Sequence, residues 1–140
     1  MPGKLTTQEV LEFLDSRPGW ITFTTIGNDG YPHSIPIGYF RDGPDVLIGG
    51  MDKTQKILNV ERNSKVSLSL ESGSTMQDIK GVLIQGEGVV VRDPEEVLEL
   101  TRTAARSRGA PEDRLPTEAR PGAAYVRVQI IKVISWDYSR

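Results

Sequence analysis

The sequence predicts a mainly β protein, a six-stranded antiparallel barrel with short helices at its ends. Segments of alternating apolar and polar residues, or of β-branched and aromatic residues, recur along the chain and indicate strands. Glycine, proline, asparagine and aspartate mark short turns between neighbouring strands, which favours hairpins. A repeating strand–helix–strand pattern is typical of parallel sheets, and this sequence does not contain one. We therefore expect the hairpins to form a closed or split β-barrel.

The chain begins with a helix and a hairpin. Thr6 and Glu9 form a capping box ahead of an apolar stripe, and Arg17-Pro18-Gly19 ends this helix. Residues 20–26 are rich in β-branched and aromatic side chains and predict the first strand. Asn28-Asp29-Gly30 then supplies the positive-φ residues of a tight turn.

The return strand after this turn carries Pro32 and Pro36. Because proline cannot donate a ladder hydrogen bond, we expect this strand to pair incompletely along one side and to leave backbone groups free for a ligand. Its residues divide between two faces: His33, Ile35, Ile37 and Tyr39 on one, and Ser34, Pro36 and Gly38 on the other.

The rest of the chain predicts four further strands and two helices. The predicted strands are 46–50, 65–71, 81–92 and 123–138, and the predicted helices are 54–62 and Asp93 to about 108. A turn at 41–45, a polar loop at 72–80 and a surface loop at 110–121 connect them. Gly86 and Gly88 mark bends or close approaches within their strand. We expect the apolar residues of the last strand to share one face: Val126, Val128, Ile130, Ile134 and Trp136.

Length and composition narrow the function classes. The 140 residues predict one domain, spanning 1–140, with a single core. The chain has no cysteine and one histidine, which excludes thiolate metal sites, cysteine nucleophiles and His-rich metal sites. A net charge of −2 gives no drive toward nucleic acid or an anionic membrane. Without a membrane-length apolar run or an apolar N-terminal segment, the sequence predicts a cytoplasmic protein.

The most informative segment runs from Gly49 to Asn59, where a short apolar strand ends in two glycines and a helix begins. Thr54 and Lys56 supply a hydroxyl and a cation at the helix start, where free N–H groups favour an anion. A lysine opposes the helix dipole at this position unless an anion is present. The segment therefore predicts a phosphate-binding turn. The alternative is a solvated lysine on an ordinary helix.

These residues, in this order, resemble the pyridoxamine 5'-phosphate oxidase-like FMN-binding split barrels, and in particular the short members that use the deazaflavin coenzyme F-420 instead of FMN. The resemblance rests on Thr24 to His33 with Pro36, on Thr54 to Asn63, and on Gly81 to Gly88 followed by Asp93-Pro94. It covers nearly the whole chain. It implies a six-stranded split barrel that binds FMN or, alternatively, coenzyme F-420, in a homodimer with the cofactor at the subunit interface.

The resemblance also implies a cofactor site. The implied contacts are Ser34, Ile35, Pro36 and Ile37 along the ring, Gly50 and Met51 beside the ribityl chain, Thr54, Gln55 and Lys56 on the phosphate, and Gln85 or Trp136 from a second subunit. The chain departs from many relatives at Asp52-Lys53, where they carry an arginine. Lys53 could substitute only as a point charge, since lysine lacks the bidentate fork of arginine.

The sequence indicates no catalytic side chain and no metal site. Ser34 lacks the surroundings of a nucleophile, and His33 has three interpretations: a proton donor, a haem ligand or a structural residue. A bound cofactor that carries the chemistry explains an enzyme without evident catalytic residues. We therefore expect an FMN- or F-420-dependent oxidoreductase acting on a small organic substrate. The alternatives are a non-catalytic FMN, deazaflavin or haem carrier, and oxidation of pyridoxamine phosphate itself, which the lack of an arginine-rich substrate segment disfavours.

Overall fold

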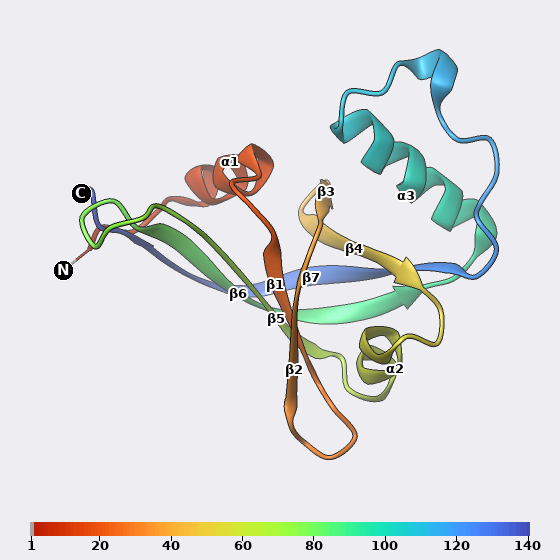
Figure 1. The fold of residues 1–140 in the computed structure, drawn as a ribbon, viewed down its shortest axis with the longest axis horizontal. Helices are drawn as coiled ribbons and strands as arrows, with labels where there is room; N and C mark the ends of the chain where they lie inside the picture. Colours follow the sequence, from red (N-terminus) through yellow and green to blue (C-terminus); the bar gives the residue numbers. More distant parts are fainter. Residues whose placement is uncertain (1) are drawn as a thin grey trace.

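The computed structural model describes residues 2–140, which form one curled sheet with three helices around it (Figure 1). The helices are α1 (Thr7–Ser16), α2 (Gln55–Arg62) and α3 (Pro94–Ser107), and a single 3₁₀ turn, η1, covers Glu112–Arg114. The strands are β1 (Ile21–Ile26), β2 (Pro32–Ile37), β3 (Phe40–Asp42), β4 (Asp45–Met51), β5 (Lys65–Ser72), β6 (Lys80–Val91) and β7 (Ala123–Asp137). Their order in the sheet is β2-β1-β5-β6-β7-β4-β3, and every adjacent pair is antiparallel.

The two edge strands of this sheet, β2 and β3, follow one another in the sequence with only Gly38 and Tyr39 between them. The sheet must therefore curl until its two edges meet at this short joint. Within the described chain, no ladder pairs β2 with β3 or β4. The barrel is thus closed by the chain but open between its edge strands. This confirms the predicted antiparallel split barrel.

The barrel has seven strands where the sequence predicted six. The additional strand is β3, whose Phe40 and Asp42 pair with Leu47 and Asp45 of β4. A turn was expected over 41–45, but the reversal needs only Gly43 and Pro44, with Gly43 at a φ of 59°. Because a two-residue loop suffices, the ladder continues into the predicted turn from both sides.

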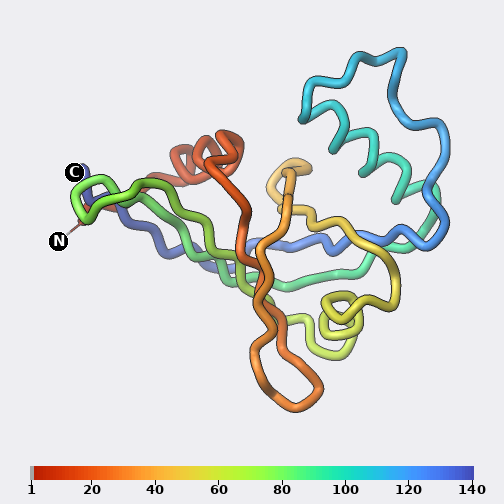
Figure 2. The backbone as a smooth tube through the Cα atoms, in the orientation of Figure 1, coloured from red at the N-terminus to blue at the C-terminus, as the bar shows by residue number. Residues whose placement is uncertain are grey.

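Two apolar clusters hold the fold together. The interior of the barrel contains side chains from most strands and from α1 and α2, including Leu14, Phe23 and Ile57, all fully buried. A second cluster lies on the outer face of β4 and β7, where α3 covers Leu47 and Tyr125. Figure 2 shows the β1–β2 hairpin extending past the rest of the sheet, with α2 beside it. The hairpin and α2 therefore form one end of the barrel.

The last strand contains a bulge that the sequence did not indicate. The register between β6 and β7 shifts between Gln85 and Gly86, so that Ile131 is left without a partner residue in β6. One extra residue reverses the alternation of a strand. Ile134 and Trp136 therefore lie on the outer face, opposite to Val126 and Val128 on the inner face. The prediction that these residues share one face is wrong for this reason.

Candidate functional site

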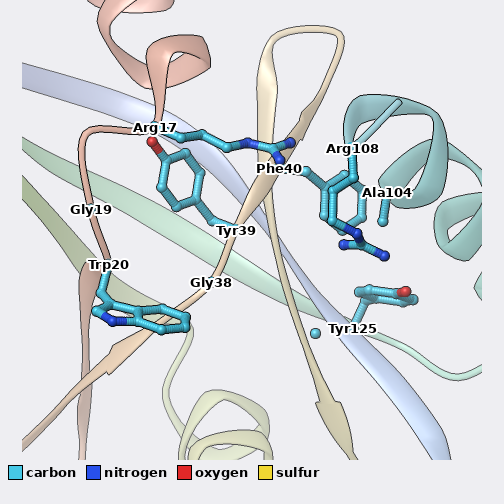
Figure 3. A pocket seen from close by; sticks show the side chains of 10 residues that line it. Arg17, Gly19, Trp20, Gly38, Tyr39, Phe40, Ala104, Arg108 and Tyr125 are labelled. Carbon is cyan, nitrogen blue, oxygen red and sulfur yellow. The ribbon is translucent and has the colours of Figure 1, made fainter. Parts of the chain in front are cut away.

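The structure brings three predicted segments together at the opening between β2 and β4. His33, at the start of β2, borders a pocket that also contacts Gln55 and Asn59 of α2. Just beyond the end of β2, Gly38 borders a second pocket with Gly49 of β4 (Figure 3). The start of β2 therefore lies near α2, and the residue that follows its end lies near Gly49 of β4.

The side chains of β2 are divided as the sequence predicts. Ser34 and Pro36 are exposed, whereas Ile35 and Ile37 are half-buried and pack against the barrel interior. Among the strands that the structure describes, β2 pairs only with β1, from Ile37 opposite Ile21 to Pro32 opposite Ile26. Incomplete pairing along one side is thus confirmed. The strand offers a flat surface with small outward side chains and an open backbone edge.

Lys56 lies where the sequence predicts a phosphate-binding cation. Its side chain covers the backbone of Gly50, because a Cβ placed at residue 50 would lie only 2.6 Å from Lys56 Nζ. Burial lowers the pKa of the Lys56 ammonium group. The ion pairs of residues 2–140 do not include Lys56. A half-buried cation without a counter-ion is stabilised when an anion binds next to it.

The beginning of α2 differs from those of the other two helices. α1 and α3 start with side-chain caps, from Thr6 and Asp93, and carry acidic residues in their first turns. α2 has no acidic residue in its first turn, and its N-cap residue Thr54 makes no side-chain cap bond. The Thr54 hydroxyl donates instead to the Met51 carbonyl oxygen at 2.8 Å. The first N–H groups of α2 and its positive dipole end therefore remain free for an external anion.

A buried polar cluster, which the sequence analysis missed, fixes α2 against the hairpin. Asn59 and Thr25 are both fully buried. Asn59 Nδ2 donates to Thr25 Oγ1 at 3.0 Å, and Asn59 Oδ1 accepts from Gln55 Nε2 at 2.7 Å and from Arg62 Nη2 at 3.0 Å. The signal that could have revealed it is an asparagine beside Val60 on the apolar side of a short helix. Gln55, expected on the phosphate, is thus also part of this cluster.

His33 lies next to this polar cluster. It pairs with Thr25 across the β1–β2 ladder and is half-buried. Its Nδ1 atom is buried and has no hydrogen-bond partner among the residues that the structure describes. The three interpretations of His33 as a proton donor, a haem ligand or a structural residue all stay predictions.

The loop ahead of α2 holds Asp52 in an ion pair and leaves Lys53 exposed. Asp52 forms an ion pair with Arg92 at 2.9 Å, and this contact lowers the pKa of the Asp52 carboxyl group. Lys53 has a left-handed φ of 67° and is exposed. The half-buried Lys56 is therefore the better placed of the two lysines to hold a phosphate.

Gln85 and Trp136 lie away from the opening between β2 and β4. Gln85 is on the outer face of β6, where it borders a separate pocket with Thr24 and Ile131. Trp136 packs its indole ring against Gly81, where a Cβ would come within 2.6 Å of the ring. Neither side chain borders the two pockets beside β2. A contact of either residue with a cofactor requires a second subunit and stays a prediction.

Two features are absent from the part of the chain that the structure describes. No group of three or more His, Cys, Asp or Glu side chains is placed to hold a metal ion in residues 2–140. None of the described helices has the length and apolar character needed to cross a membrane.

Comparison with known proteins finds one matching family and several solved structures of similar fold. The family model described as pyridoxamine 5'-phosphate oxidase matches residues 6–137. A conserved hypothetical protein of Mycobacterium tuberculosis has a TM-score of 0.83 and 24% identity, covering 96% of this chain and 86% of that one. An F-420 reductase has a TM-score of 0.66 and 18% identity, covering 88% and 94%. The haem storage protein HutZ of Vibrio cholerae has a TM-score of 0.73 and 15% identity, covering 96% and 98%. No curated protein matches the chain significantly.

Proposed function

The chain belongs to the pyridoxamine 5'-phosphate oxidase family, and from this premise we propose that it binds FMN, or alternatively coenzyme F-420, as an oxidoreductase of a small organic substrate. The observation that carries the proposal is the half-buried ammonium group of Lys56. It has no ion-pair partner in the described chain and lies beside the uncapped start of α2. Relatives in fold that include an F-420 reductase add support for the cofactor class.

The residues at the opening fit the parts of such a cofactor. Lys56 and the first N–H groups of α2 would hold the phosphate, and Gly50 gives the Lys56 side chain the room it needs. The outward side of β2, with Ser34 and Pro36, would lie flat against the ring. When bound, the cofactor supplies hydride or electron transfer. The chain itself anchors the phosphate, orients the ring and shields one side of it from water with the barrel.

We also propose that two copies of the chain form a homodimer with the cofactor at the interface. The outer face of β6 and β7 supports this, because it carries Ile131, which is 68% exposed, and Ile134, which is 42% exposed. Apolar surface of this kind marks contact sites. Gln85 lies on the same outer face, in a pocket with Ile131, so the interface would bring it close to the partner subunit.

Replacement of Lys56 by alanine tests the phosphate assignment. Loss of a charge-assisted contact of about 1.5–3 kcal/mol predicts roughly ten- to hundredfold weaker binding of FMN or coenzyme F-420. The matched control is Lys4→Ala, which removes an exposed lysine close in sequence to the N-terminus, and Figure 1 shows that terminus at the far end of the molecule from α2. Fluorescence titration measures the cofactor affinity of both variants. Equal affinities in Lys56→Ala, Lys4→Ala and the wild-type protein would contradict the proposal.

A second candidate function is a carrier that binds a flavin, a deazaflavin or haem without turnover. The similarity in fold to a haem storage protein and the lone half-buried His33 favour it. Purified protein with reduced cofactor, mixed with a panel of quinone acceptors, separates the two functions. Turnover supports the oxidoreductase, whereas cofactor binding without turnover, or a Soret band in the purified protein, supports the carrier.

A further inference from the structure

One edge of β7 has no neighbouring strand over half of its length. β6 pairs with β7 along nearly its whole other edge, whereas β4 covers only Ala123 to Val128. Near the C-terminus, Gly3 forms a single bridge with Asp137. Among residues 2–140, no strand pairs with the edge between these two points. The backbone of residues 129–136 is therefore open to a further strand on this side.

The backbone groups of β7 on this edge point toward the open side. Asp137 and Gly3 exchange two hydrogen bonds, of 2.8 and 2.9 Å, so the N–H and C=O groups of Asp137 point to the edge. Because these groups alternate between the two edges of a strand, those of Ser135 and Val133 point the same way. The Leu5 N–H does not continue the ladder, since it donates to Ser135 Oγ at 2.9 Å. Within the described chain, the N-terminal segment thus adds one step of a strand and then turns into α1.

A groove of about 570 Å³ follows this open edge, between α1 and the residues of β7 from Ile130 to Ser135. We call it the edge groove. Val133 lies opposite the fully buried Ile84 and faces inward, whereas Ile134 is on the outer face. The groove contacts both Val133 and Ile134. Since neighbouring residues of a strand point to opposite faces, a groove that contacts both lies along the edge itself.

The edge groove combines apolar side chains with positive charge. On the side of α1, Leu5 and Val10 are buried and Leu11 is half-buried. Lys4 and Lys132 are exposed, and the lining contains no acidic side chain. The ion pairs of residues 2–140 include neither of these lysines. The groove is therefore complementary to a segment that carries both apolar and acidic side chains.

Lys132 argues against a second copy of this chain as the occupant of the edge groove. Two copies that paired along this edge about a two-fold axis would bring their Lys132 side chains close together, and like charges on paired strands are destabilising. Lysine on an edge strand is one means by which proteins prevent such pairing. The same charge attracts an acidic strand. The homodimer proposed above is built on the outer face of β6 and β7.

We propose that the edge groove binds an extended acidic peptide segment of a partner protein, which adds to β7 as a further strand. Its backbone would bond to the outward N–H and C=O groups of Val133 and Ser135, and its carboxylates would bind Lys4 and Lys132. The open stretch at 129–134 is about 20 Å long, which accommodates about six peptide residues. In strand addition, backbone hydrogen bonds supply affinity and side-chain contacts supply specificity. The inference does not depend on the proposed cofactor.

Fluorescence anisotropy with the full chain and fluorescein-labelled hexapeptides tests the charge complementarity. The probes are a peptide of alternating glutamate and valine and a peptide of alternating lysine and valine. We expect the acidic peptide to bind at least fivefold tighter than the basic one. The double variant Lys4→Glu/Lys132→Glu should reverse this preference. Equal binding of the two peptides, or a preference for the acidic peptide that survives the variant, overturns the inference.

Two N-methylated forms of the acidic peptide test strand addition itself. In an extended peptide, the N–H groups of the glutamates point to one edge and those of the valines to the other. Because only one edge of an added strand faces β7, methylation of one set should weaken binding at least tenfold more than methylation of the other. Equal effects of the two methylations overturn the inference. This comparison needs no variant of the protein, so it holds even if Lys4→Glu/Lys132→Glu does not fold.

The matched control for the charge reversal is Arg114→Glu/Arg120→Glu. Both arginines are exposed and lie outside the edge groove, and the change in net charge is the same. The preference for the acidic peptide should survive in this control, and its loss would show attraction to the net charge alone. Analytical ultracentrifugation with saturating acidic peptide tests the alternative occupant. Unchanged assembly supports the proposal, whereas release of monomers would assign the edge to a second copy and overturn it.

Discussion

At the scale of single residues, the position of the Lys56 side chain depends on the absence of a side chain at Gly50. The Lys56 ammonium group occupies the space that any Cβ at residue 50 would need. The sequence could predict this pair, because a glycine at a strand end and a lysine in the following helix start are both local signals. It could not predict that Lys56 has no counter-ion within residues 2–140, because that depends on where the fold places the acidic groups.

The lowered pKa of Lys56 predicts how binding depends on pH. A phosphate favours the protonated lysine, so its pKa is higher in the complex than in the free protein. Affinity for FMN should therefore stay constant below the pKa of the free protein and fall as the pH rises through it. Because that pKa is below the usual 10.5, the decrease begins earlier than for an ordinary lysine. Fluorescence titration from pH 7 to 10 measures the profile.

The variant Lys56→Ala is the reference for this profile, since it retains every other group that titrates. We expect the fall with rising pH to disappear in this variant. Parallel profiles in the two proteins would show that another group is responsible.

At the scale of elements, Asn59 explains why α2 lies where it does. Replacing Asn59 with leucine leaves Thr25 Oγ1, Gln55 Nε2 and Arg62 Nη2 without their buried partner. Gln55 and Arg62 are exposed, so water can replace their partner, but the hydroxyl of the fully buried Thr25 stays unpaired, which predicts a decrease of about 1–3 kcal/mol in the free energy of unfolding. Urea denaturation measures it. Leu58→Ala on the exposed side of α2 is the control, with an expected change under about 0.5 kcal/mol. A similarly small change in Asn59→Leu would contradict this role.

The sequence predicted elements better where the signals were local. The capping box of Thr6 and Glu9 forms as expected, with reciprocal bonds of 3.1 and 2.9 Å, and α3 begins at the predicted Asp93 cap. The bulge at Ile131 was missed because Ile134 and Trp136 are apolar although they lie on the outer face, so the apolar residues before and after the bulge alternate in the same phase in the sequence. Gly86 signalled an irregularity in the neighbouring strand, where a Cβ would lie 2.6 Å from Val128 Cγ1.

At the scale of the whole molecule, the proposed homodimer predicts that a substitution in its interface lowers the molecular mass in solution from that of a dimer to that of a monomer. Ile131→Lys places a charge on the exposed outer face of β7 and should convert a dimer to a monomer with weaker cofactor binding. Analytical ultracentrifugation measures the mass. Met76→Lys is the control, because Met76 is similarly exposed, at 62%, but lies in the loop between β5 and β6. A wild-type monomer, or a dimer that survives Ile131→Lys, would contradict the proposed interface.

Some binding surfaces at this scale lay beyond reach from the sequence alone. Ser34 to Ile37, Gly50 and Lys56 were predictable because they lie within one continuous run of about 25 residues. The edge groove was not, because Lys4, Pro44 and Val133 come from three distant segments that only the curled sheet brings together. In the sequence, the last strand shows its apolar alternation, which does not indicate how far β4 covers its edge.

The most direct test of the account compares FMN with riboflavin, which lacks the phosphate, in the wild-type protein and in Lys56→Ala. If the phosphate binds Lys56 at the start of α2, the wild-type protein should bind FMN at least tenfold tighter than riboflavin. The variant should bind the two about equally. An unchanged ratio of the two affinities in Lys56→Ala would contradict the central claim.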